Sequence, residues 1–297
     1  MWQVMDGVST GLTTRSIFDS IKRTKNSALV HWAESSGSDR PALVFVPGFL
    51  SENFDDDKME DWKSGIVEVA ERYDFEAYGL FWPSGTVWDL LMGTSWNRTM
   101  AACAAPRLGM GLLAPVLLNP LLLAPALGIG LPSLWNAMDV WKKAVANADE
   151  VSKDIHQWLG LINRPVILVG HSLGGRIVLK ASANARRYNV LQTYAFAPAV
   201  QEEDCNFNKI RAHVEEKSTI FYSQNDTTLN VWYRIGEMTW TPPLGYTGIT
   251  QKKSSSKVQS LDVSNWGDST MKHDNYRYFV SELLNDRRLH TTIDEWE

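Results

Sequence analysis

Residues 165–175 of the chain read PVILVGHSLGG. The apolar run over residues 166–169 is short and rich in β-branched side chains, which favours a buried parallel strand over a helix. A G-x-S-x-G pattern centred on Ser172 follows at once, and a helix is predicted from there to about Arg187. A strand, a sharp turn that carries a serine and a helix together indicate a nucleophile held at the carboxyl edge of a parallel sheet.

The glycines of this motif have a steric purpose. They lie two residues on either side of Ser172, where the strand and the helix must pass close to each other. The turn exposes the serine Oγ, and the N-terminal dipole of the next helix faces negative charge that develops there. His171 stands beside the serine, but the turn directs its ring away from Oγ, so we interpret it as a packing or supporting residue and not as the base.

Apolar runs alternate with amphipathic segments along the rest of the chain. Strands are predicted over residues 42–46, 75–82, 191–196, 219–223 and 258–263, and helices over 59–73, 136–159, 229–235 and 276–284. This alternation predicts a mostly parallel sheet with helices on both faces, and the serine turn within it predicts an α/β-hydrolase fold. We expect an N-terminal extension over residues 1–40 and one hydrolase domain over residues 41–297.

Composition excludes several classes of function. The chain has 297 residues and a net charge of −5, and its basic residues are interleaved with acids, so a nucleic-acid surface is not expected. Cys103 and Cys205 give neither a disulfide framework nor a metal-ligand spacing, and we expect two unpaired thiols and no metal or organic cofactor. Residues 1–10 lack the basic segment and apolar core of a signal peptide, which favours a cytoplasmic or membrane-associated protein.

A serine hydrolase needs two donors for the oxyanion of its tetrahedral intermediate. One is the backbone N–H of Leu173, directly after the nucleophile. The second is expected in the loop after an early strand, where Gly48 permits a turn and the N–H of Phe49 is the best candidate. Leu50 is the neighbouring alternative.

The order of the triad in this fold places the base after Ser172. Three histidines qualify: His213, His273 and His290. His213 precedes the strand that should carry the acid, and His290 lies near a polar tail. His273 lies between the last predicted strand and the last predicted helix, which is where this fold needs its base.

The acid should follow a strand at the carboxyl edge of the sheet. Asp226 follows the strand over residues 219–223, where its carboxylate could accept Nδ1–H from the imidazole of His273. The remaining alternatives are Asp204, Asp262 and Asp268.

At these residues the chain resembles the "domain of unknown function 726" family, which includes lipase-like proteins of the transmembrane and coiled-coil domain protein 4 type. The resemblance covers about residues 42–280, in the order of the family's motifs. It is carried by residues 45–52 with Asp55, Asp56 and Trp62, and by residues 77–82, 168–175, 223–226 and 273–278. It implies an α/β-hydrolase fold, lipase-like chemistry and membrane association, with Ser172, Asp226 and His273 at the family's triad positions.

One segment does not fit an ordinary sheet protein. An insert over residues 84–135 separates a strand from the next helix, and residues 108–138 contain no charged side chain. A spanning helix of about 20 residues fits by length. Four prolines and several glycines favour broken or re-entrant helices instead.

Three interpretations of the insert remain open: a membrane-embedded hairpin, a mobile hydrophobic lid and a buried cap. The first two imply a lipid substrate, and the first predicts membrane binding through residues 108–132. The sequence therefore predicts a serine lipase or carboxylesterase that cleaves acyl esters of membrane lipids through an acyl-enzyme. The alternatives are a membrane-associated interaction protein with a degenerate hydrolase fold, and a soluble esterase or thioesterase for small esters.

Overall fold

The structure, a computed structural model, describes residues 21–23, 27–49, 51, 57–85, 131–185, 190–250, 253–266 and 270–286. Its centre is an eight-stranded sheet with the strand order β1-β2-β4-β3-β5-β6-β7-β8. The strands are β1 (Ile21–Arg23), β2 (Ala28–Ala33), β3 (Ala42–Val46), β4 (Glu76–Phe81), β5 (Val166–His171), β6 (Val190–Phe196), β7 (Val214–Tyr222) and β8 (Val258–Asp262).

The six strands β3 to β8 are parallel to one another. β2 pairs with β4 in antiparallel orientation, and β1 pairs with β2 at the outer edge of the sheet. Every residue of β3, β5 and β6 is buried, as the continuous apolar runs predict for strands covered on both faces. The predicted sheet with helices on both faces is confirmed.

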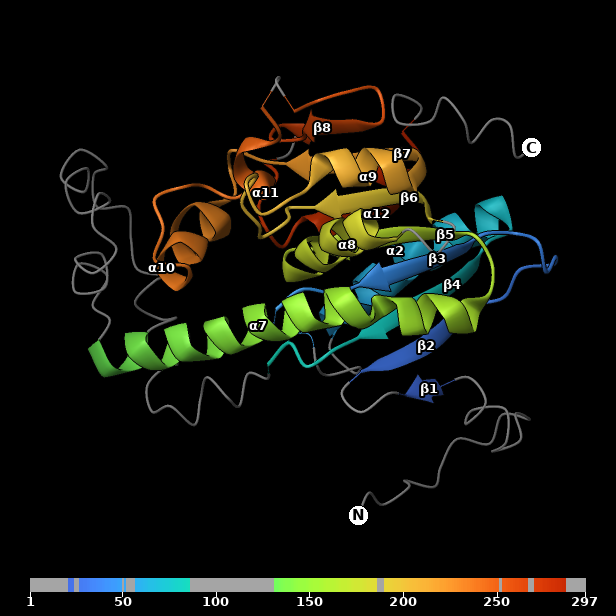
Figure 1. Cartoon of the computed structure of the whole chain (residues 1–297), viewed down its shortest axis with the longest axis horizontal. Coiled ribbons are helices and arrows are strands. Elements are labelled where there is room, and N and C mark those ends of the chain that lie inside the picture. The colour runs from blue at the N-terminus through green and yellow to red at the C-terminus, as the bar shows by residue number, and fades with distance from the viewer. Residues whose placement is uncertain are drawn as a thin grey trace, which may run out of the picture.

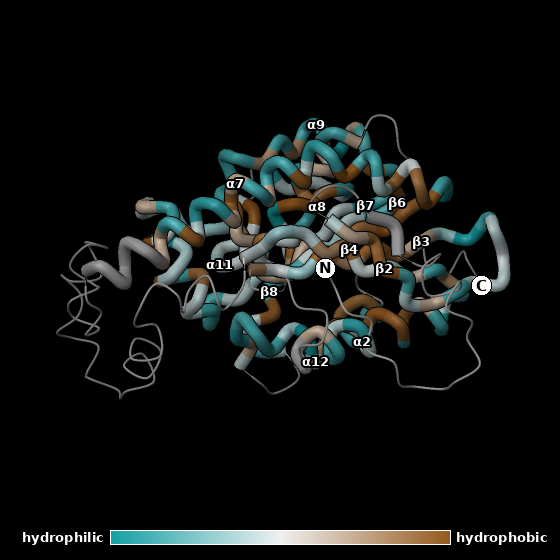
Figure 2. The backbone as a smooth tube through the Cα atoms, turned by 90° about the horizontal axis from the view of Figure 1, so that it is seen from below, coloured by the Kyte–Doolittle hydropathy of each residue, from teal (hydrophilic) through white to brown (hydrophobic). Residues whose placement is uncertain are grey.

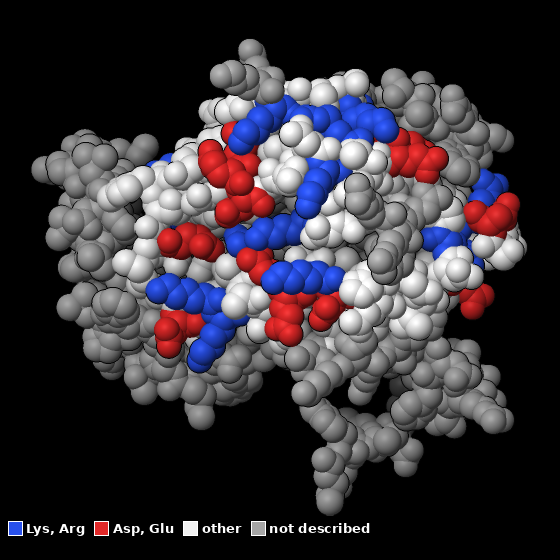
Figure 3. Space-filling view, in the orientation of Figure 1, with Lys and Arg blue, Asp and Glu red and all other residues white. Residues whose placement is uncertain are grey.

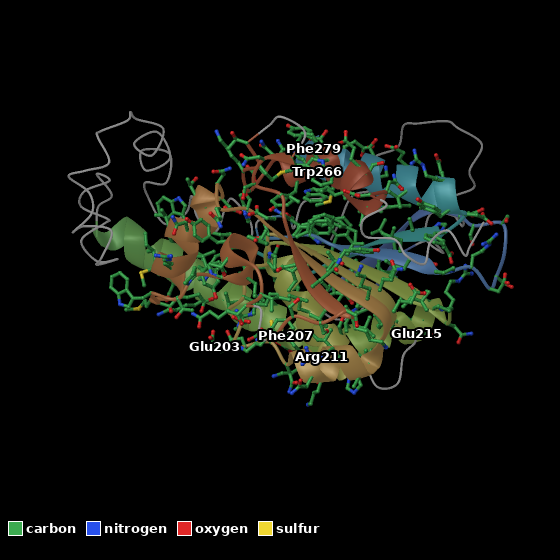
Figure 4. The ribbon with its side chains drawn as sticks, turned by 90° about the horizontal axis from the view of Figure 1, so that it is seen from above. Glu203, Phe207, Arg211, Glu215, Trp266 and Phe279 are labelled. Carbon is green, nitrogen blue, oxygen red and sulfur yellow. The ribbon has the colours of Figure 1, made fainter. Side chains whose placement is uncertain are left out.

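Helices form a layer on each face of the sheet (Figures 1 and 2). One layer contains α7 (Leu131–Ile162), α8 (Leu173–Asn184) and α9 (Phe207–His213), and the other contains α2 (Asp57–Tyr73) and α12 (Tyr276–Leu284). Figure 4 shows the two layers by their side chains, with Phe207 and Arg211 of α9 on one side of the sheet and Phe279 of α12 on the other. Shorter elements follow β7, namely the π-helix η1 (Thr228–Tyr233), α10 (Arg234–Gly236) and α11 (Leu244–Thr247).

The long helix α7 buries one apolar stripe. Ala144, Ala148, Val151, Ile155 and Trp158 recur at helical spacing and are all buried. The helix is longer at both ends than the predicted 136–159, and its N-terminal end extends past the sheet beside α10 (Figure 1). The outer face of the layer that contains α7 carries Lys and Arg interleaved with Asp and Glu (Figure 3).

The N-terminal strands were not predicted. Residues 28–33 form β2, which pairs with β4 across a register shift between His31 and Ala33. The stretch that the sequence sets apart as an extension therefore adds two strands, β1 and β2, to the same sheet.

The structure describes the insert only at its two ends, residues 84–85 and 131–135, and Cys103 also lies outside the described residues. Among the helices that are described, none combines the length and the apolar character needed to cross a bilayer.

Candidate active site

Ser172 occupies the turn between β5 and α8. Its φ of 56° and ψ of −117° form a conformation that is strained for any residue with a side chain. The Ser172 N–H donates to the Phe196 carbonyl at 2.9 Å. The Ser172 carbonyl accepts from the N–H groups of Ala199 at 3.0 Å and Arg176 at 3.1 Å. The neighbouring strand and the first turn of α8 therefore hold the serine in the sharp turn that the sequence predicts.

The glycines of the motif allow a backbone approach that no side chain would permit. A Cβ on Gly174 would lie 1.9 Å from the Val46 carbonyl oxygen, and one on Gly170 would lie 2.3 Å from the Gly174 carbonyl oxygen. The start of α8 is thereby pressed against the end of β3, which brings the nucleophile next to the loop that follows β3.

Asp226 lies in the loop after β7 and is fully buried. Its Oδ2 lies 2.7 Å from Nδ1 of His273, and its Oδ1 accepts from the N–H of Leu229 at 2.8 Å. The second bond places the carboxylate at the start of η1, where free backbone N–H groups favour an anion. Both carboxylate oxygens are therefore fixed, one by the backbone of η1 and one by the imidazole of His273. The His273 side chain is 12% exposed.

Hydrogen bonds join the loop of Asp226 to the loop of His273. Ser223 Oγ donates to the Met271 carbonyl at 2.6 Å, and Asn225 Nδ2 donates to the Ser264 carbonyl at 2.8 Å. Met271 N–H in turn donates to the Ser264 carbonyl at 3.0 Å. Asp262 takes part in this network by accepting from Ser264 N–H at 2.9 Å and Oγ at 2.5 Å, so it supports the loop.

Two other sequence candidates have different surroundings. Asp204 is exposed, and His213 ends α9 with its Nδ1 2.8 Å from the Ala183 carbonyl. The candidates Leu50, Asp268 and His290 lie outside the described residues.

The loop after β3 approaches the nucleophile from the other side. A Cβ on Gly48 would lie 2.9 Å from the Cβ of Ser172, so only glycine fits here. Trp82 Nε1 donates to the Pro47 carbonyl at 2.9 Å and fixes this loop. Leu173, the other predicted oxyanion donor, is the first residue of α8.

Phe49 connects this loop to α7. Its ring packs edge-on against Trp141 at 5.4 Å between centroids. Trp141 also packs edge-on against Tyr233 at 6.1 Å, and its Nε1 donates to Glu237 Oε1 at 3.2 Å. Trp141 therefore lies between the loop after β3 and the segment after Asp226. The helical pattern of α7 did not reveal these contacts.

A charged cluster joins α7 to α8, the helix that follows the nucleophile. The buried Arg176 donates from Nε and Nη2 to the two oxygens of Asp149 at 2.8 and 3.0 Å, and Lys180 Nζ donates to Oδ1 at 2.8 Å. Burial alone would raise the pKa of Asp149, but the hydrogen bonds from Arg176 and Lys180 outweigh it and keep that pKa below its usual value. The carboxylate stays ionised and ties the two helices together.

His171 was interpreted as a packing residue, and its ring is indeed buried between helices. It lies 4.9 Å from the Trp62 ring of α2 and 6.1 Å from the Tyr276 ring of α12. It also lies 4.7 Å from the ring of His273, and its Nε2 is 3.0 Å from the His273 carbonyl oxygen. Sequence reasoning missed this last contact, and no sequence pattern signals it.

No cluster of three or more His, Cys, Asp or Glu side chains that could hold a metal ion occurs in the described part of the chain. The described residues place a strained serine directly after β5 and an aspartate–histidine pair in the loops after β7 and β8, all on the carboxyl side of the parallel strands.

Sequence comparison places the whole chain in a family. The pattern of the family described as "Protein of unknown function (DUF726)" matches residues 3–290. The chain belongs to the DUF726 family. One curated relative of this DUF726 protein, an uncharacterized membrane protein of Schizosaccharomyces pombe, is 25% identical over 310 residues that cover 99% of this chain and 48% of the yeast protein. The chain therefore spans about half the length of that relative.

Solved structures similar to the DUF726 chain include proteins named as an esterase and as a carboxylesterase. Est1E from Butyrivibrio proteoclasticus has a TM-score of 0.45 at 10% identity, covering 91% of this chain and 96% of that one. An esterase of Pyrococcus furiosus, Pf2001, has a TM-score of 0.44 at 11% identity, with 95% and 93% covered. Carboxylesterase CesB of Bacillus subtilis has a TM-score of 0.41 at 12% identity, with 89% and 88% covered. The α/β-hydrolase fold rests on the chain's own architecture: a mostly parallel sheet with helices on both faces and a serine turn between β5 and α8.

Proposed function

We propose that the protein is a serine hydrolase that cleaves acyl esters of membrane lipids through an acyl-enzyme. The observation that carries this proposal is the 2.7 Å contact between His273 Nδ1 and Asp226 Oδ2, made by a histidine whose ring packs on His171, the residue directly before the strained Ser172. A buried carboxylate on Nδ1 leaves Nε2 as the nitrogen that can exchange protons with a nucleophile.

In the proposed reaction, Ser172 Oγ attacks the acyl carbonyl while His273 Nε2 takes its proton. Asp226 holds the resulting imidazolium, and the N–H groups of Phe49 and Leu173 receive the oxyanion. The C–O bond to the alcohol then breaks, and the alcohol leaves with the proton from His273. Water attacks the acyl-enzyme by the same base and releases the carboxylic acid and the free serine.

The choice of a lipid as substrate is supported by two observations. Residues 108–138 carry no charge in a chain of which 21% is charged, and exposing so much apolar surface to water would invite aggregation. The yeast relative is named as a membrane protein. We therefore include membrane binding through residues 108–132 in the proposal, which makes a bilayer lipid the substrate within reach.

Labelling by a fluorophosphonate probe, which reacts with activated serines, tests the chemistry. We expect wild-type protein to be labelled, and Ser172→Ala and Asp226→Asn to lose labelling while they keep the wild-type melting temperature within a few degrees. Ser182→Ala is a matched control, because Ser182 is buried in the same helix layer but bonds to Val178 and Thr193. An unlabelled wild type would favour an interaction protein with a degenerate fold.

Lipid mass spectrometry of membranes exposed to wild type and to Ser172→Ala tests the substrate. We expect a fatty acid and a deacylated lipid to accumulate only with wild type. In a second variant, a short polar linker replaces residues 108–130, which leaves α7 intact. This variant should lose membrane binding and hydrolysis of bilayer lipid while it still hydrolyses a water-soluble ester. If it cleaved both substrates like wild type, membrane binding through the insert would be wrong.

A further inference from the structure

His171 is the last residue of β5 and the residue directly before Ser172. Its side chain is 7% exposed and packs against Trp62 of α2 and Tyr276 of α12. It thus lies in the helix layer of α2 and α12, the same layer that the loop of His273 enters before α12 begins.

The contact between His171 and His273 has a defined direction. A backbone carbonyl can only accept, so His171 Nε2 must carry the proton that it donates to the His273 carbonyl oxygen at 3.0 Å. The same ring is neutral, because burial, assisted by the electrostatic influence of the adjacent His273, lowers the pKa of His171 to about 3. A neutral ring with its proton on Nε2 leaves Nδ1 as an acceptor.

That Nδ1 faces the loop on the other side of the nucleophile. A Cβ on Gly48 would lie 3.4 Å from His171 Nδ1 and 3.1 Å from the His171 carbonyl oxygen. His171 therefore directly precedes Ser172 and lies beside the loop that follows β3. It also donates a hydrogen bond to the backbone of His273.

We propose that His171 is a positioning residue, which fixes the backbone of His273 so that its imidazole stays aligned between Asp226 and Ser172. This inference rests on the proposed hydrolase function. The loop of His273 is hydrogen-bonded to the loop of Asp226 at Met271. The bond from His171 fixes it a second time two residues later, at the His273 carbonyl. With both ties, the imidazole cannot swing away from the carboxylate when Nε2 takes or gives a proton.

Two variants separate a positioning role from simple packing. His171→Phe keeps an aromatic ring of similar size between Trp62 and Tyr276 but has no donor. His171→Gln places an amide N–H the same number of bonds from Cα as the lost Nε2, so it can restore the hydrogen bond. On a short water-soluble ester, we expect His171→Phe to lower kcat by about 10-fold to 100-fold with KM unchanged, as a slightly misplaced base does. We expect His171→Gln to recover kcat to within about 3-fold of wild type.

The thermal midpoint of both variants is measured beside kcat. If activity fell in parallel with stability, or if His171→Phe matched wild type in kcat, the inference would be overturned. Loss of activity in the donor-free variant with rescue by glutamine, at similar stability, supports it.

Nuclear magnetic resonance of ¹⁵N-histidine protein gives a readout that needs neither activity nor a folded variant. In wild type, we expect His171 as the neutral Nε2–H tautomer and His273 with a downfield Nδ1–H proton bonded to Asp226. A wild-type His171 protonated on Nδ1 would overturn the inference even if the protein hydrolysed lipid well. Conversely, the protein could show the expected tautomer of His171 and yet neither react with the fluorophosphonate nor hydrolyse esters. In that case the proposed hydrolase function would be wrong, and not the position assigned to His171.

Discussion

The sheet has a carboxylate at its amino edge, where the parallel strands begin, and another at its carboxyl edge, where they end, and the two have different partners. At the amino edge, Glu76 begins β4 and is 16% exposed. Its Oε2 lies 2.9 Å from Arg164 Nη1, and its Oε1 accepts from the Tyr78 hydroxyl at 2.6 Å and lies 3.3 Å from His31 Nε2. Arg164 also donates to the Ser35 hydroxyl at 3.1 Å, so this cluster joins the strands to the loop before β3.

At the carboxyl edge, Asp226 is bonded to a backbone N–H and to the imidazole of His273. A guanidinium is charged at every pH at which the protein is folded, so the charge of Glu76 is permanently balanced. An imidazole can gain and lose a proton near neutral pH, which the proposed reaction requires of the partner of Asp226. The two carboxylates therefore differ in whether the partner carries a permanent charge, as at Glu76, or can exchange a proton, as at Asp226.

Replacing Ser172, at the carboxyl edge, should have the largest effect on activity and little effect on stability. Ser172→Ala should lower kcat on a short acyl ester by about 10⁶-fold, as loss of a triad serine does, and change the free energy of unfolding by less than about 1 kcal/mol. Steady-state kinetics and urea unfolding measure both quantities. Near wild-type turnover would contradict the central proposal.

Changing the carboxylate at the carboxyl edge should have the next largest effect. Asp226→Asn should lower kcat by about 10⁴-fold, because its oxygen keeps the bond from Leu229 N–H and its NH2 group, a donor, then faces His273 Nδ1 and favours the wrong tautomer. Asp262→Asn is the matched control, since Asp262 bonds to Ser264 and not to the histidine. An equal loss in both variants would move the acid assignment to Asp262.

A third prediction concerns acid stability. Burial lowers the pKa of His171 to about 3 from the 6.5 of an unfolded chain. Between pH 6.5 and 3 the unfolded state binds a proton that the folded state does not, so wild type should lose stability as the pH falls through that window. His171→Gln has no such group, and its stability should fall less, by roughly 4 kcal/mol at the acid end. Urea unfolding at several pH values measures this, and parallel curves would refute it.

The smallest effect should come from the amino edge. Arg164→Met leaves the partly buried Glu76 without its cation and should lower the free energy of unfolding by about 2 kcal/mol. The kcat of the folded variant should stay at the wild-type value, because the cluster lies at the opposite ends of the strands from Ser172. Arg72→Met, which removes an exposed pair with Glu68, should cost less than about 0.5 kcal/mol. A loss of kcat in Arg164→Met would show that the edges are coupled.

The sequence predicted the central fold because its signals were local. The helix over residues 276–284 has the predicted bounds, and the buried strands β3, β5 and β6 follow their apolar runs. β7 begins five residues earlier than predicted, since its amino end contains the charged residues Glu215, Glu216 and Lys217, which interrupt any apolar run there. The N-terminal β2 was missed for a similar reason, because most of its residues are only partly buried.

The candidate site followed from topology rather than from contact. Asp226 and His273 follow β7 and β8, which are neighbours in the sheet, so strand order alone placed them near each other. The contact of His171 with the His273 carbonyl depends on the path of one loop. The packing of Trp141 on Phe49 depends on where α7 passes the loop that follows β3. Neither path is encoded in a local pattern.

The contact at Gly174 has a mechanical consequence. A Cβ there would lie 1.9 Å from the Val46 carbonyl oxygen and 2.6 Å from that of Pro47, so the two main chains meet with no side chain between them. Two main-chain segments in direct contact have no rotamers to rearrange, so the start of α8 and the end of β3 must move as one rigid body. Drift of side chains elsewhere in the core can change the packing of the helices without altering the spacing between the serine and the loop that faces it.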